Sequence, residues 1–111
     1  MRNISQIEWR ELIANDANAV VIDVRNPFEW KEGVFENALL ISIQNPSSFI
    51  SEVEKLEEEK NYFIYCRSGQ RSLMACQILK SIGYKTTYNL AGGILKWDGK
   101  IVFPAISKME E

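Results

Sequence analysis

The sequence contains no histidine and only two cysteines, and these two shortages exclude several kinds of active site. Zinc sites are built mainly from Cys and His ligands, and two cysteines without metal-binding spacing do not supply a ligand set. Nucleophilic sites of the Ser-His-Asp or Cys-His kind need an imidazole base, which this chain lacks. A reactive nucleophile here must therefore be activated by charge or by backbone donors, and we expect no metal and no other cofactor.

Strong positive charge and long apolar runs are also absent. The 13 Lys and Arg residues and the 15 Asp and Glu residues give a net charge of −2, so no basic surface for nucleic acid or for an anionic membrane is predicted. No apolar stretch approaches the length of a membrane span, and the first residues do not resemble a signal peptide. We therefore expect a cytoplasmic protein without nucleic-acid or membrane partners, in which a reducing environment keeps both thiols free.

What the sequence does contain is the composition of an ordinary globular domain. Hydrophobic residues make up 46% and charged residues 25% of the 111 residues, which are enough for a single domain at 1–111. Apolar runs predict strands near 19–24, 39–43, 62–66 and 86–90, with helical segments between them. This alternation predicts an α/β fold with right-handed crossovers.

The most informative stretch is residues 62–72, in which an apolar run ends at Cys66 and a polar loop leads into a helix predicted at 72–82. In open α/β sheets, ligands bind at the carboxyl ends of the strands. Backbone N–H groups at a helix start, the helix dipole, Arg67 and Arg71 all favour an anion, and they favour a thiolate for the same reason. The alternative is a buried cysteine that merely ends a core strand. The two arginines favour the first interpretation, in which Cys66 is a nucleophile with a lowered pKa.

The second cysteine has a different predicted role. Cys76 shares one face of the predicted helix with Ala75, Leu79 and Ile82 and should be a small core side chain. It lies more than one helical turn beyond Cys66, so we expect its Cα to be farther away than the roughly 7 Å that a disulfide tolerates.

Three segments resemble the rhodanese family in the expected order. Cys66-Arg67-Ser68-Gly69-Gln70-Arg71 resembles the family's six-residue active loop. Asp23-Val24-Arg25, followed by Glu29 and Gly33, resembles an earlier family motif. Residues 90–97, Leu-Ala-Gly-Gly-Ile-Leu-Lys-Trp, resemble its closing segment. Residues 33–38 depart from the usual Gly-His-Ile-Pro-Gly-Ala pattern, because the His and the Pro are missing.

The resemblance implies a fold and an activity. The fold would be a five-stranded, mainly parallel sheet flanked by helices on both faces, with an edge strand around residues 2–4. The activity would be that of a sulfurtransferase: Cys66 takes sulfane sulfur from thiosulfate or a persulfide donor, holds it as a persulfide, and passes it to a thiol or to cyanide. The expected partners are a small sulfur-donor anion and a thiol acceptor, such as a small redox protein. We expect a monomer.

Roles for individual residues also follow from the resemblance. Cys66 would be catalytic, and the substrate would be bound by Arg67, Ser68, Gly69, Gln70, Arg71 and Ser72. The anion-binding role is assigned to Arg71 in preference to Arg67, with an ion pair to Asp23 or Glu29 as the alternative for either arginine. Asp23 and Arg25 would form a supporting shell or, alternatively, a surface ion pair that stabilises the turn.

Two other functions stay open. Phosphatases and arsenate reductases of the thiolate type use a Cys-x5-Arg loop, whereas Cys66 and Arg71 form a shorter Cys-x4-Arg loop, which favours sulfur transfer. The sequence does not distinguish a turnover enzyme from a persulfide carrier or interaction module. Family members that act on 3-mercaptopyruvate resemble one another in a loop without arginine after the cysteine, so Arg67 and Arg71 predict a preference for thiosulfate.

Overall fold

The structure is a computed structural model that describes residues 1–104; residues 105–111, for which the sequence predicts no functional role, lie outside the described part. The elements are β1 (Arg2–Ile4), α1 (Gln6–Ala14), β2 (Ala19–Asp23), the 3-10 helix η1 (Pro27–Glu32), β3 (Leu39–Leu40), α2 (Pro46–Val53), β4 (Asn61–Tyr65), α3 (Gln70–Ser81), β5 (Thr87–Leu90) and the 3-10 helix η2 (Ile94–Lys96). No helix within residues 1–104 is long and apolar enough to cross a membrane.

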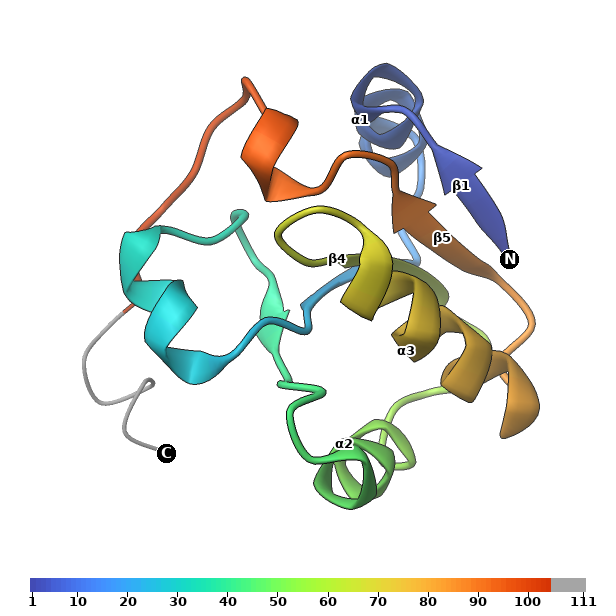
Figure 1. The fold of residues 1–111 in the computed structure, drawn as a ribbon. Coiled ribbons are helices and arrows are strands. Elements are labelled where there is room, and N and C mark those ends of the chain that lie inside the picture. Colours follow the sequence, from blue (N-terminus) through green and yellow to red (C-terminus); the bar gives the residue numbers. More distant parts are fainter. Residues whose placement is uncertain (105–111) are drawn as a thin grey trace.

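The five strands form one sheet in the order β1-β5-β4-β2-β3, and every neighbouring pair is parallel (Figure 1). This confirms the predicted α/β fold and the edge strand at residues 2–4. In the register between β2 and β4, Asp23 lies opposite Tyr65. The carboxyl end of β2 therefore lies beside Cys66, which directly follows β4.

Helices cover both faces of the sheet, as the resemblance implies. On one face, α2 and α3 pack against the sheet through an apolar cluster that includes Phe49, Val53 and Leu79. On the other face, α1 and the segment after β5 pack through a cluster that includes Trp9 and Ile94. Figure 1 shows these two groups of helices on opposite sides of the strands. Because both faces are covered, the central strands β2 and β4 are mainly apolar, with runs such as Val20-Val21-Ile22 and Phe63-Ile64, as expected for a parallel sheet.

The lengths of some elements differ from the predictions. The strand expected at 39–43 is only Leu39–Leu40, although the N–H groups of Ile41 and Ile43 still donate to carbonyls of β2 and the residue after it. The helix expected to continue to residue 58 ends at Val53. Helix α3 begins at Gln70, two residues before the predicted start, because Gly69 adopts a left-handed conformation (φ 107°) that places the helix start close to Cys66.

Candidate active site

The candidate site is the short loop between β4 and α3. Cys66 directly follows β4, and Gly69 precedes the first turn of α3. The carbonyl of Gly69 accepts hydrogen bonds from the backbone N–H of Leu73 (3.2 Å) and from the side-chain amide of Asn89 on β5 (3.0 Å). The left-handed conformation of Gly69 is one that L side chains rarely adopt. Glycine at this position therefore allows the sharp turn that joins the end of β4 to the start of α3.

The thiol of Cys66 lies inside this loop. The residue is 1% exposed, the backbone N–H of Gly69 donates to Sγ at 3.1 Å, and the Ser72 hydroxyl donates at 3.3 Å. Burial raises the pKa of the Cys66 thiol, but hydrogen bonds from the Ser72 hydroxyl and from the N–H groups of Ser72, Gly69 and Ser68 outweigh it, so the net pKa is lowered. The direction agrees with the sequence prediction, and the donors belong to the loop and to the first turn of α3.

The turn at Gly92 and Gly93 after β5 brings two backbone hydrogen-bond donors against the loop. The backbone N–H of Ile94 donates to the carbonyl of Cys66, and that of Leu95 donates to the carbonyl of Arg67, both at 2.9 Å. A Cβ on Gly93 would lie 2.3 Å from the carbonyl oxygen of Arg67, so only glycine fits. The sequence does not indicate that the residues after this turn donate to the first two carbonyls of the loop.

The two arginines of the loop have different surroundings. Arg71 makes a two-pronged ion pair with Glu29 of η1, with N–O distances of 2.6 and 3.0 Å. The hydrogen bonds that Arg71 donates to Glu29 lower the pKa of Glu29 and raise the pKa of Arg71. Arg67 is exposed and has no ion-pair partner among residues 1–104. The structure thus places Arg71 in the ion pair that the sequence left as an alternative.

Asp23 and Arg25 also form an ion pair, but the pair is buried and not, as the alternative had it, on the surface. Both are buried, at 0% and 3% exposure, and Arg25 Nη2 lies 2.8 Å from Asp23 Oδ2. The same Nη2 donates to the carbonyl of Gly33 at 2.7 Å, and the backbone N–H of Phe35 donates to the hydroxyl of Tyr65 at 2.9 Å. Arg25 therefore holds the start of segment 33–38, which departs from the family pattern. The hydrogen bond between Phe35 and Tyr65 joins the same segment to the end of β4.

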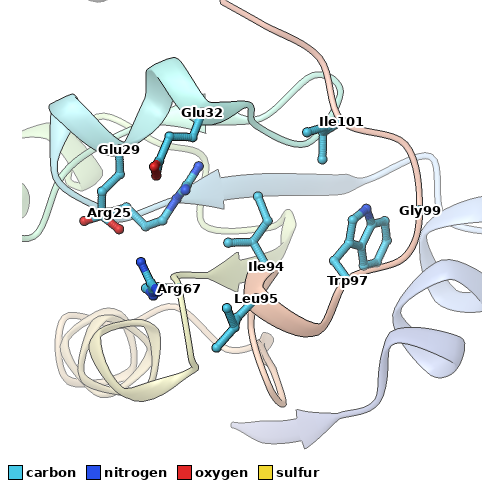
Figure 2. Close-up of a pocket in the computed structure, with 9 residues that line it drawn as sticks. All are labelled: Arg25, Glu29, Glu32, Arg67, Ile94, Leu95, Trp97, Gly99 and Ile101. Carbon is cyan, nitrogen blue, oxygen red and sulfur yellow. The ribbon is translucent and has the colours of Figure 1, made fainter.

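A pocket of about 340 Å³ opens beside the loop (Figure 2). Its lining residues are Arg25, Glu29, Glu32, Arg67, Ile94, Leu95, Trp97, Gly99 and Ile101. In Figure 2 the charged side chains gather at one end, and Trp97 and Ile101 stand at the other. Of the loop residues predicted to bind substrate, only Arg67 lines this pocket. The pocket walls after residue 94 carry no signal in the sequence beyond their apolar character.

The other predicted binding residues differ in their exposure. Ser68 and Gln70 are exposed, Gly69 and Arg71 are half-buried, and Ser72 is buried against the thiol. Glu29 and Asn89 were not predicted as site residues, and both contact the loop or its arginine. Glu29 had two signals, its position in the family motif after Asp23-Val24-Arg25 and its place as an alternative ion-pair partner for the loop arginines.

Comparisons with known proteins agree with this geometry. The family model for the rhodanese-like domain matches residues 6–100. Curated relatives named tRNA uridine(34) hydroxylase are 35% identical in Chlamydia caviae and 33% in Chlamydia trachomatis, in each case over 90% of this chain. The chain spans about a third of their length (34% and 35%).

Solved structures give the same fold. A rhodanese-related protein from Thermoplasma volcanium has a TM-score of 0.80 at 30% identity, covering 94% of this chain and all of that one (100%). A rhodanese-like domain protein from Staphylococcus aureus has a TM-score of 0.81 at 24% identity, covering 95% of this chain and 100% of the other, which shows the shared fold alone. The fold and the family model together establish that the chain belongs to the rhodanese-like domain family.

Proposed function

We propose that the protein is a sulfurtransferase that moves sulfane sulfur from thiosulfate, or from a persulfide donor, to a thiol or to cyanide through a persulfide on Cys66. The observation that carries the proposal is the environment of the thiol: it is buried, its pKa is lowered, and the Ser72 hydroxyl and the Gly69 N–H donate to its sulfur. These donors provide the activation that the absence of histidine requires.

The reaction divides into two displacements at sulfur. In the first, the Cys66 thiolate attacks the outer sulfur of thiosulfate, the S–S bond of thiosulfate breaks, and sulfite leaves with the bonding electron pair. In the second, an acceptor nucleophile attacks the outer sulfur of the Cys66 persulfide, and Cys66 leaves as a thiolate. Cyanide becomes thiocyanate, and a thiolate becomes a persulfide. No net oxidation or reduction is needed.

The loop can serve both displacements because each begins or ends with negative charge on sulfur. Donors already positioned around Sγ stabilise such charge without reorganisation, as in an oxyanion hole. Arg67 is exposed at the pocket and free to orient the sulfonate end of thiosulfate, whereas Arg71 is bound to Glu29. We therefore assign the direct anion contact to Arg67 and the task of holding the loop to the pair of Arg71 and Glu29.

The decisive experiment is an intact-mass measurement after incubation with thiosulfate. We expect the wild-type protein to gain one sulfur atom and to release one equivalent of sulfite. The variant Cys66→Ala should gain no sulfur. Adding cyanide should remove the sulfur and produce thiocyanate. Continuous thiocyanate production at excess thiosulfate indicates a turnover enzyme, and a single round indicates a carrier. A protein that never gains sulfur from thiosulfate, from inorganic polysulfide or from a low-molecular-weight persulfide would contradict the proposal.

A second candidate comes from the curated relatives named tRNA uridine(34) hydroxylase, at 33–35% identity. In this candidate the same thiol serves modification of a tRNA. The net charge of −2 weighs against tRNA binding by this chain alone. Mass analysis of uridines in tRNA incubated with the protein decides between the two, because hydroxylated uridine is expected only for the second.

Phosphatase or arsenate-reductase activity is the less favoured alternative. The Cys-x4-Arg loop is one residue shorter than the loop of those enzymes, and its Arg71 is bound to Glu29. We expect no turnover of phosphate monoesters and faster turnover of thiosulfate than of 3-mercaptopyruvate. Comparing the three substrates under the same conditions tests both expectations.

A further inference from the structure

The pocket beside the Cys66 loop has four charged residues, of which two are already neutralised. Arg25 is paired with Asp23, and Glu29 is paired with Arg71. The remaining two, Arg67 and Glu32, are exposed and have no ion-pair partner within residues 1–104. They carry opposite signs and come from different segments, the loop after β4 and the end of η1.

The rest of the pocket is apolar. Ile94, Leu95, Trp97 and Ile101 form its walls, and Figure 2 shows them extending from the charged end toward the far end of the pocket. Leu95 is 60% exposed, so its side chain is available for contact with a ligand in the pocket. The pocket volume of about 340 Å³ is at the lower end of the range for small-molecule sites and corresponds to about eleven water volumes. Thiosulfate, a compact anion, uses neither the apolar walls nor Glu32.

We propose that this pocket selects a zwitterionic amino-acid thiol, of which cysteine is the simplest example, as the sulfur acceptor. The proposal rests on the proposed function. Arg67 binds the α-carboxylate, Glu32 binds the α-ammonium group, and the side-chain methylene groups pack against the apolar walls. Two charges of opposite sign distinguish a zwitterionic thiol from an anionic thiol that lacks the ammonium group.

The chemistry of this acceptor balances without an added oxidant. The acceptor thiolate attacks the outer sulfur of the Cys66 persulfide, the S–S bond of the persulfide breaks, and its electron pair stays on Cys66. The product is an amino-acid persulfide, and Cys66 returns to the thiolate that Ser72 and Gly69 stabilise. Arg67 contacts the sulfonate of the donor first and the carboxylate of the acceptor afterwards, so one cation serves both half-reactions.

The test separates loading from acceptance. Wild type, Glu32→Gln and the control Glu11→Gln, an exposed glutamate on α1 outside the pocket, are loaded with thiosulfate, and the added sulfur is counted by intact mass. If thiosulfate does not load Cys66, inorganic polysulfide is used instead. A failure to load by any donor therefore contradicts the proposed function, whereas the acceptor step is measured on protein already loaded.

The acceptor step is measured with cysteine and with 3-mercaptopropionate, which lacks the ammonium group. The readout is the ratio of the two second-order rate constants. Since each variant is compared with wild type on the same two thiols, differences in thiol pKa cancel. We expect Glu32→Gln to lower the ratio by about three- to tenfold and Glu32→Lys to lower it further.

The control Glu11→Gln should keep the wild-type ratio. An unchanged ratio in Glu32→Gln, or an equal fall in Glu11→Gln, would overturn the proposal. Thermal unfolding of each variant verifies that the comparison is made on folded protein.

Discussion

The two cysteines of this protein are about equally buried, but the pKa values of their thiols are shifted in opposite directions. Cys66 is 1% exposed and Cys76 is 0% exposed, yet the pKa of Cys66 is lowered, whereas burial raises that of Cys76 to about 12. Cys76 lies inside α3, where backbone N–H groups are already bonded along the helix, and the Thr87 side chain only partly offsets burial. Cys66 lies before the helix, where N–H groups are still free. Equal burial therefore does not give the two thiols the same pKa here; the supply of free hydrogen-bond donors makes the difference.

The largest expected difference between the two thiols is in catalysis. Cys66→Ser should lower sulfur transfer by about a thousandfold or more, because a hydroxyl is a poor nucleophile and cannot hold a persulfide. Cys76→Ser should retain activity and lose about 1–3 kcal/mol of unfolding free energy, because it places a more polar group in the core. Steady-state kinetics and urea unfolding of both variants measure this. An inactive but folded Cys76→Ser would refute the assignment.

The next expected difference is in alkylation. The reaction of Cys66 with iodoacetamide should rise with pH and level off below the ordinary thiol pKa of about 8.5, because its pKa is lowered. Cys76 should react at neutral pH only when the protein unfolds, at least about a thousandfold more slowly, since unfolding costs about 5–15 kcal/mol. Peptide mapping after timed alkylation resolves the two sites. A midpoint for Cys66 at or above 8.5 would remove the argument from loop donors.

A smaller effect should come from removing one donor. Ser72→Ala deletes the hydroxyl 3.3 Å from Sγ and should raise the pKa of Cys66, lowering its alkylation rate at neutral pH by up to about tenfold. Thr87→Val is the matched change near Cys76 and should leave alkylation of Cys66 unaffected. The pH profile of the alkylation rate gives both answers. If Ser72→Ala kept the wild-type profile, backbone donors alone would account for the low pKa.

The smallest expected effect separates the two arginines. Arg67→Ala should lower kcat/KM for thiosulfate by about three- to tenfold with little change in stability, because its side chain is exposed. Arg71→Ala should lower the unfolding free energy by about 1–3 kcal/mol, because it leaves Glu29, which is 7% exposed, without its partner. Kinetics and thermal unfolding of both variants test the division. Equal kinetic losses without destabilisation of Arg71→Ala would return the anion contact to Arg71.

Much of this protein was determined by the sequence alone, because the relevant signals are local. The alternation of apolar runs and helical segments predicted the α/β sheet that the structure shows. The abrupt change from an apolar strand to a polar loop with two arginines located Cys66 as the candidate nucleophile. Helical spacing placed Cys76 in the core. Each of these inferences depends only on residues close in the chain.

Only the tertiary structure decided which distant side chains meet at the loop. Glu29 and Arg71 are 42 positions apart, and their pairing depends on how η1 packs beside the start of α3. The close approach of Gly93 to the carbonyl of Arg67 likewise depends on the path of the chain after β5. The sequence offered Asp23 and Glu29 as equal partners for either arginine, because charge and residue type do not specify distance. The packing of η1 against α3 resolved that choice and left Arg67 free at the pocket.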